Sequence, residues 1–102
     1  MKAYILPRLG GKTTKLIELA AERGGYIVCL SRPDAERIAK LARKLDLNIL
    51  FPITLQEFLD GRRTRGAFIK ELYFDDIDRI LTAMAGNVPV VAFSMTGVTE
   101  QE

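Results

Sequence analysis

Residues 6–14 constrain this chain more than any other stretch, because they join a short apolar run to an amphipathic segment through glycine, lysine and threonine. The glycines Gly10 and Gly11 allow backbone N–H groups to turn inward around an anion, and Lys12 and Thr13 follow directly. In phosphate-binding loops a lysine at this place reaches the outer phosphates, and the next hydroxyl ligates Mg²⁺. The full pattern has a leading glycine where this sequence has Leu6. The stretch therefore predicts a phosphate-binding loop that matches half of the pattern.

The same residues could also form a simple glycine turn before a helix with a basic first turn. The segments on either side help to distinguish this turn from a phosphate-binding loop. Upstream, residues 3–6 are expected to form a buried strand ended by Pro7, which has no N–H for a ladder. Downstream, apolar residues at helical spacing predict a helix closed by glycines: Leu16, Ile17, Ala20 and Ala21, then Gly24 and Gly25. A strand, a glycine loop and a helix that begins at the lysine favour the phosphate loop.

The composition bounds the class of protein and the kind of metal site. With 102 residues, 48% of them hydrophobic and 27% charged, the chain is expected to be one domain over residues 1–102, with residues 95–102 as a mobile tail. No apolar run approaches the roughly 18 residues of a membrane span and no signal peptide is evident, so a cytoplasmic location without membrane partners is expected. Because histidine is missing and Cys29, expected to be buried, is the single cysteine, no zinc cluster can form and a metal must be a hard cation such as Mg²⁺.

The middle of the chain predicts a strand followed by a helix. Residues 25–30 form a continuous apolar run that is typical of a central parallel strand. Ser31 is expected to cap a helix with an apolar face of alanine, isoleucine and leucine. The opposite face, which includes Arg37 and Lys40, is basic and either meets an acidic partner or is simply solvated.

Two shorter elements and a basic turn follow. Residues 48–51 predict an edge strand cut by Pro52, and Thr54 with Glu57 gives a capping-box signal for a helix over residues 55–60. The densest positive charge comes next, at Arg62, Arg63 and Arg65. This turn could bind nucleic acid, act on the nucleotide of a neighbouring molecule, or be an exposed loop.

The second informative stretch is an apolar strand over residues 71–74 that ends in Asp75 and Asp76. Carboxylates at the carboxyl end of a parallel strand face the crevice where ligands bind, and one of them can hold Mg²⁺ opposite Thr13. Asp75 and Asp76 could instead merely cap the helix that is expected over residues 77–85, and both roles can be true together. Residues 87–93 then predict a further buried strand, and the polar groups after it could sense a terminal phosphate: Ser94, Met95 and Thr96.

The predicted elements form an open α/β sheet that resembles the core of P-loop NTPases. Residues 8–14 resemble the Walker A loop, and residues 72–78 resemble Walker B as it is written in AAA+ ATPases, where a glutamate usually stands in place of Asp76. Residues 26–44 and 53–59 are more similar to the first motor domain of superfamily 1 helicases. The whole chain also resembles small P-loop proteins encoded by bacteriophages and prophages.

The resemblance implies a minimal open parallel sheet with flanking helices, in a P-loop NTPase-like three-layer sandwich. It implies that ATP and Mg²⁺ are bound, with Thr13 and Asp75 on the metal and Asp76 orienting the attacking water. Nucleotide contacts are implied for Arg8, Gly10, Gly11, Lys12, Thr13 and Thr14. It further implies that the strand at residues 88–93 lies between the strands at 3–6 and 72–74, with the strand at 25–30 outside the acidic one.

The motifs and the resemblance together predict an ATP–Mg²⁺ binding protein with slow hydrolysis. The resemblance to phage and prophage proteins further implies a phage DNA-related process. Because Asp76 is one methylene shorter than the glutamate, binding follows more directly than turnover. The alternative is a degenerate P-loop domain that acts as an interaction or nucleic-acid-binding module through Arg62, Arg63 and Arg65. A nucleoside kinase is a third, weaker alternative. Motor function would require a partner or self-assembly into a homo-oligomer.

Overall fold

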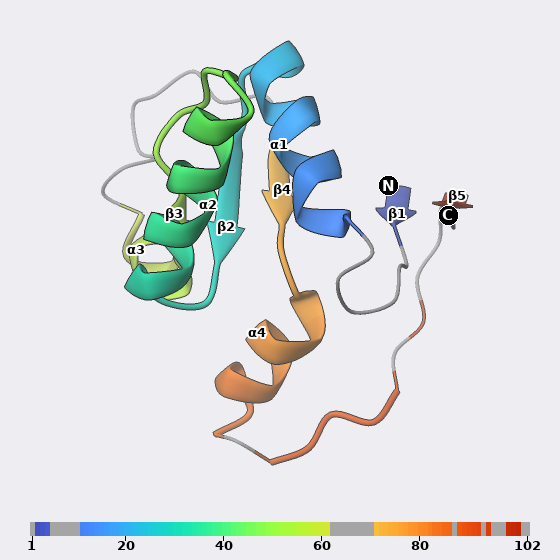
Figure 1. Ribbon diagram of the computed structural model, residues 1–102. Coiled ribbons are helices and arrows are strands. Elements are labelled where there is room, and N and C mark those ends of the chain that lie inside the picture. The colour runs from blue at the N-terminus through green and yellow to red at the C-terminus, as the bar shows by residue number, and fades with distance from the viewer. Residues whose placement is uncertain are drawn as a thin grey trace.

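The computed structural model describes residues 2–4, 11–61, 71–86, 88–92, 94 and 98–100. Helices and strands alternate along the chain (Figure 1): β1 (Lys2–Tyr4), α1 (Lys12–Arg23), β2 (Tyr26–Cys29), α2 (Arg32–Lys44), β3 (Ile53–Thr54), α3 (Leu55–Asp60), β4 (Leu72–Phe74), α4 (Ile77–Met84) and β5 (Val98–Glu100). Three strands form a parallel sheet in the order β3-β2-β4, and β1 pairs with β5 in a separate parallel ladder. The predicted α/β class, with a small parallel sheet and flanking helices, is confirmed.

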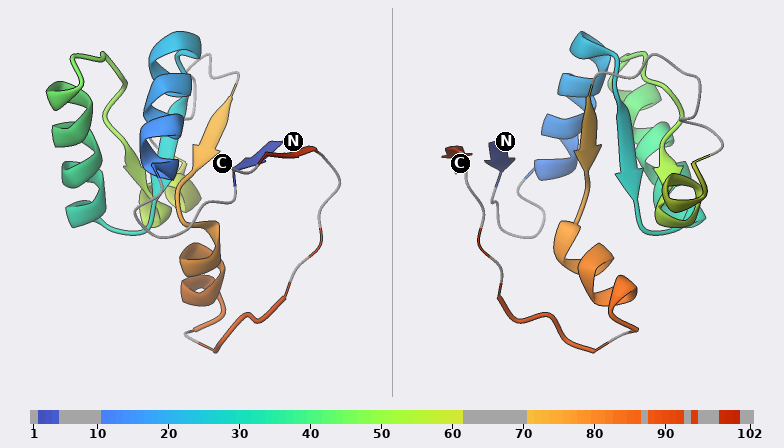
Figure 2. Two further views of the ribbon diagram at one scale, coloured as in Figure 1. Left: turned by 45° about the vertical axis from the view of Figure 1, so that its right-hand side comes forward. Right: turned by 180° about the vertical axis from the view of Figure 1, so that it is seen from behind.

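Helices α1 and α2 cover one face of the three-stranded sheet, which stands in front of them when the molecule is seen from behind (Figure 2). The core between them is made of alternate strand residues and the apolar helix faces: Ile17, Ala20, Ile27, Cys29, Ala35, Ile38, Ala42 and Tyr73. Gly24 ends α1 in the left-handed conformation, as predicted, and its N–H bonds the carbonyl of Ala20 at 2.8 Å. Burial raises the pKa of the Cys29 thiol to about 11, which fits its predicted role as an apolar filler.

Helix α3 contacts the opposite face of the sheet. Phe58 of α3 meets Phe74 of β4 edge to face, with ring centroids 5.4 Å apart. The predicted capping box is confirmed, because the Thr54 hydroxyl accepts from the Glu57 N–H at 3.2 Å and the Glu57 carboxylate accepts from the Thr54 N–H at 2.9 Å. The sheet therefore carries helices against both faces within the described part of the chain.

The strand predicted at residues 87–93 is wrong over the residues that the structure describes. Residues 88–92 form neither helix nor strand, and Val88, Val90 and Val91 are exposed. Pro89 explains the error, because it has no N–H to donate to a ladder. The predicted strand order fails with it, because β1 pairs with β5, which falls within residues 95–102. This pair forms a sheet separate from the one that contains β4 (Figure 1). The predicted pairing of the acidic strand β4 with β2 is confirmed.

Two local predictions also need correction. Residues 48–51 form no strand, and the edge strand is β3, which lies after Pro52 and pairs Ile53 with Val28. Ser31 occupies the position before α2, but its hydroxyl makes no capping bond to the helix backbone. It donates instead to the Asp34 carboxylate at 2.9 Å, which ties together two side chains of the same turn.

Candidate functional site

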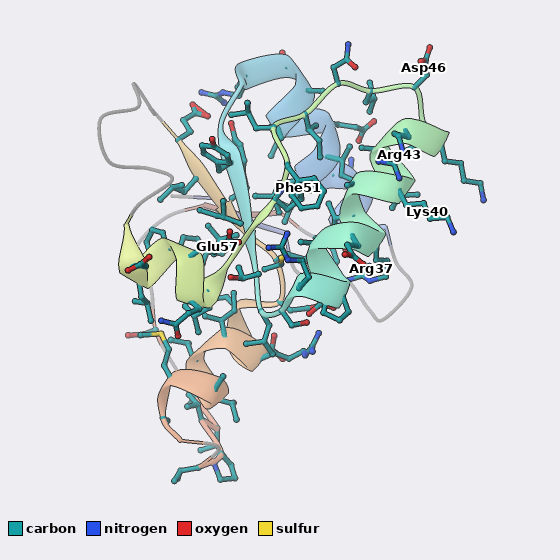
Figure 3. All side chains as sticks on the ribbon, turned by 90° about the vertical axis from the view of Figure 1, so that its left-hand side faces the viewer. Arg37, Lys40, Arg43, Asp46, Phe51 and Glu57 are labelled. Atoms are coloured by element: carbon teal, nitrogen blue, oxygen red, sulfur yellow. The ribbon has the colours of Figure 1, made fainter. Side chains whose placement is uncertain are left out.

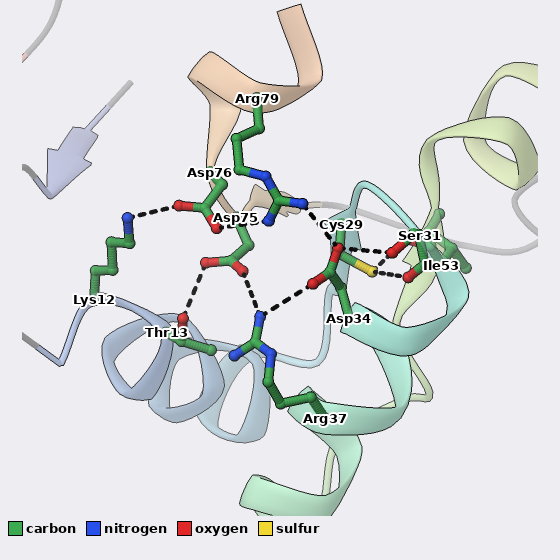
Figure 4. A network of polar contacts seen from close by, with 10 residues as sticks. All are labelled: Lys12, Thr13, Cys29, Ser31, Asp34, Arg37, Ile53, Asp75, Asp76 and Arg79. Carbon is green, nitrogen blue, oxygen red and sulfur yellow. Dashed lines mark hydrogen bonds and ion pairs between the residues drawn. The ribbon is translucent and has the colours of Figure 1, made fainter. Parts of the chain in front are cut away.

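The carboxyl ends of β2 and β4 and the start of α1 meet at one edge of the sheet. Because the strands are parallel, the residues that follow them project at the same edge. The N–H of Asp75 extends the ladder beyond β4 by bonding the carbonyl of Val28 at 2.9 Å. The first turn of α1 lies beside this edge, so Lys12 and Thr13 approach Asp75 and Asp76 (Figure 4).

Thr13 and Asp75 form the closest link between the two predicted motifs. The Thr13 hydroxyl donates to Oδ1 of Asp75 at 3.1 Å, although the two residues are 62 positions apart in the sequence. Asp75 is only 2% exposed. Burial, followed by the charge of Asp76, raises the pKa of Asp75 above its ordinary value. The hydrogen bond from Thr13 and the charges of Arg37 and Lys12 oppose this shift and favour the carboxylate.

Lys12 and Asp76 form an ion pair in which Nζ lies 2.6 Å from Oδ1. Burial alone would raise the pKa of Asp76, but the hydrogen bond and charge of Lys12, followed by Arg79, bring that pKa below its ordinary value. The backbone of Asp76 is left-handed, at φ 54° and ψ 56°, an uncommon conformation for a residue with a side chain. Its side chain makes no capping bond to α4. The interpretation of Asp76 as merely a helix cap is therefore wrong, because its carboxylate pairs with Lys12.

Two arginines and a third carboxylate complete the network. Arg37 of α2 lies 3.5 Å from Asp34 and 3.9 Å from Oδ2 of Asp75. Arg79 of α4 lies 3.7 Å from Asp34 and 3.6 Å from Oδ2 of Asp76. Asp34 thus connects the two arginines, and each arginine connects Asp34 to one carboxylate at the end of β4 (Figure 4). In this network the charges of the cations and of the carboxylates balance.

Arg37, Arg79 and Asp34 are residues of this network that the sequence patterns do not indicate. Arg37 was placed on the basic outer face of α2, where Figure 3 shows it in line with Lys40 and Arg43. Helical spacing does predict two of the ion pairs. Arg79 lies three residues after Asp76, and Arg37 lies three residues after Asp34, so the members of each pair share one helix face. The sequence does not show that Asp34 of α2 lies near Arg79 of α4, because this contact forms only when the chain folds.

The remaining predicted site residues are only partly described. Gly11 precedes α1 with a φ of +84°, a conformation that glycine adopts without strain, and Thr14 is half-buried in the first turn of α1. Arg8 and Gly10 lie outside the described residues, as do Met95 and Thr96. The basic turn with Arg62, Arg63 and Arg65 also lies outside them, so its role stays a prediction.

The site offers hard oxygen donors to a metal. In the described ranges, no group of three or more histidine, cysteine, aspartate or glutamate side chains is arranged to hold a metal ion. The Thr13 hydroxyl and the Asp75 carboxylate do lie together, at 3.1 Å. Mg²⁺ commonly uses one or two such protein ligands and takes the others from water and phosphate. Thr13 and Asp75 therefore fit Mg²⁺ in the presence of a phosphate ligand.

Comparison with known proteins adds no assignment: no family model, no curated protein and no solved structure matches this chain. None of the helices in the described ranges is long and apolar enough to cross a membrane.

Proposed function

We propose that this protein binds ATP together with Mg²⁺ in a P-loop NTPase-like site at the carboxyl edge of its sheet, and that it hydrolyses ATP slowly. The hydrogen bond between Thr13 and Asp75 is the observation that carries the proposal. Those residues were assigned to one metal from two separate stretches of sequence, and they lie in contact. A chance Gly-Lys-Thr at a helix start would not require a buried carboxylate opposite the threonine.

The start of α1 supplies the phosphate-binding part of this proposal. Unpaired N–H groups and the positive end of the helix dipole favour an anion at this place. Lys12 is half-buried there and has a flexible side chain that can exchange Asp76 for a phosphate oxygen. Lys12 would contact the outer phosphates, and the backbone N–H of Gly11 would contribute to the loop.

Thr13 and Asp75 would hold the metal ion. Mg²⁺ bound there would neutralise charge on the outer phosphates, which is its contribution to phosphoryl transfer. Asp76 has a lowered pKa and stays ionised at neutral pH, so it can accept a hydrogen bond from a water molecule. Its side chain is one methylene shorter than the glutamate that is usual at this place in the resembled families, which agrees with slow turnover. The wider setting, a DNA-related process of a phage with self-assembly or a partner, stays a prediction.

Ligand-induced stabilisation tests the proposed binding. A ligand at 100 times its Kd stabilises a fold by about 2.7 kcal/mol, which raises the Tm of a small domain by on the order of 10 °C. The wild type is expected to show such a shift with ATP and Mg²⁺. Lys12→Ala should weaken ATP binding by about 1.5–3 kcal/mol, the contribution of a charge-assisted hydrogen bond. The matched control is Lys40→Ala, because Lys40 is an exposed lysine on the outer face of α2 (Figure 3). Equal shifts in both variants would refute the role of Lys12.

A further inference from the structure

Arg79 is held loosely beside the Lys12–Asp76 pair. It lies on α4, one helical turn beyond Asp76, and its side chain is 49% exposed. Its two ion pairs, at 3.6 Å to Asp76 and 3.7 Å to Asp34, are longer than the 2.7–2.9 Å that is typical of charge-assisted hydrogen bonds. A guanidinium with such contacts loses little when it turns toward another anion, because it has several N–H donors and can keep one carboxylate.

Asp76 marks the place where that anion would lie. Lys12 contacts Oδ1 of this carboxylate, and Arg79 contacts its Oδ2. The two cations therefore share one small anionic group, and a phosphoryl group presents oxygen atoms of the same charge at a similar spacing. A phosphate that is accepted by Lys12 lies within reach of Arg79.

Arg37 is less suited than Arg79 to contact a phosphate that is bound by Lys12. Its contact at the site is with Asp75, the proposed metal ligand, and a divalent cation beside Asp75 would repel a second positive group. Arg79 pairs with Asp34 and Asp76, neither of which is assigned to the metal.

We propose that Arg79 binds the terminal phosphate of the nucleotide and makes the site prefer nucleoside triphosphates over diphosphates. This inference rests on the proposed function, because it needs a nucleotide at Lys12. Lys12 then serves both kinds of nucleotide, whereas Arg79 contributes only when the last phosphate is present.

Competition binding with two ligands tests this specificity. The ligands are adenylyl imidodiphosphate, a triphosphate analogue that resists hydrolysis, and ADP, both with Mg²⁺. Arg79→Ala is expected to lower the affinity for the triphosphate analogue roughly ten-fold or more, and the affinity for ADP less than about two-fold. Arg79→Lys keeps the charge without the fork of donors and should give an intermediate loss. The control Arg43→Ala, at the far end of α2 (Figure 3), should change neither affinity.

The possible failures are distinguishable. If Arg79→Ala weakens both ligands equally, or neither, the proposal for Arg79 is overturned while nucleotide binding itself stands. If the wild type binds neither ligand, the proposed function is overturned and the proposal for Arg79 with it. Should Arg79→Ala not fold, as judged by circular dichroism, the ratio of the two affinities in Arg79→Lys decides the question in the same way.

Discussion

Replacing Asp75 with asparagine is expected to leave the fold at least as stable at neutral pH, although it removes a proposed Mg²⁺ ligand. The Asp75 carboxylate is 2% exposed, and burial raises its pKa, so the folded chain carries an unfavourable charge there. An asparagine has nearly the same volume, and its amide oxygen can still accept the hydrogen bond from Thr13. Arg37 loses only a 3.9 Å contact and keeps Asp34.

Comparison with Asp75→Ala distinguishes the effect of the charge from that of the hydrogen bond, because asparagine removes only the charge whereas alanine removes both. The alanine variant leaves the Thr13 hydroxyl without its acceptor in a partly buried place, which costs about 1–3 kcal/mol. For a domain of this size, each kcal/mol lowers Tm by roughly 4–8 °C. Asp75→Asn should lose no more than about 0.5 kcal/mol, or gain stability, because it keeps the acceptor and removes the buried charge.

The stability of the fold should depend on pH through the ionisation of Asp75. Because the folded pKa of Asp75 lies above the ordinary 3.8, the folded chain binds the proton more tightly than the unfolded chain does. The cost of ionised Asp75 is full at neutral pH, declines as the pH falls through the raised pKa, and is gone near 3.8. The advantage of Asp75→Asn should shrink over the same window. Urea denaturation of both variants and the wild type, at neutral pH and near pH 4, measures this. If Asp75→Asn loses as much stability as Asp75→Ala at neutral pH, the buried charge stabilises the fold and the reasoning is refuted.

Two predictions concern the fold that positions the site. Gly25→Ala should destabilise the chain by about 1–3 kcal/mol, because the added Cβ would collide with the carbonyl of Glu71 and the ring of Tyr73. Thermal melting would detect this loss. An unchanged Tm would show that β2 and β4 can separate locally. Thr54→Ala should cost about 1 kcal/mol through loss of the capping bond to α3, measured by urea denaturation, and Thr54→Ser should recover most of it.

The contact between Thr13 and Asp75 could be predicted because each residue lies at the end of an element whose type is clear from the sequence. A parallel sheet then brings those ends to one edge, whatever the exact strand order. The capping box at Thr54 was predictable for a similar reason, because its hydrogen bonds are local.

Other features depend on long-range packing that local patterns do not record. The apolar run at residues 88–92 resembles a strand in composition, but Pro89 removes a donor and β1 pairs elsewhere. The places of Arg37 and Arg79 in the site follow from how α2 and α4 approach Asp34. The basic face of α2, which looks solvated in the sequence, therefore supplies one cation of the site, Arg37, and α4 supplies another, Arg79.

Isothermal titration calorimetry with ATP tests the central claim most directly. The wild type is expected to give a saturable heat with ATP in the presence of Mg²⁺, and a weaker one when Mg²⁺ is removed by a chelator. Lys12→Ala should bind ATP more weakly under both conditions, whereas Asp75→Asn should lose the difference that Mg²⁺ makes. If the wild type shows no heat with any nucleoside triphosphate at millimolar concentration, Lys12, Thr13, Asp75 and Asp76 do not form a nucleotide site, and the account is contradicted.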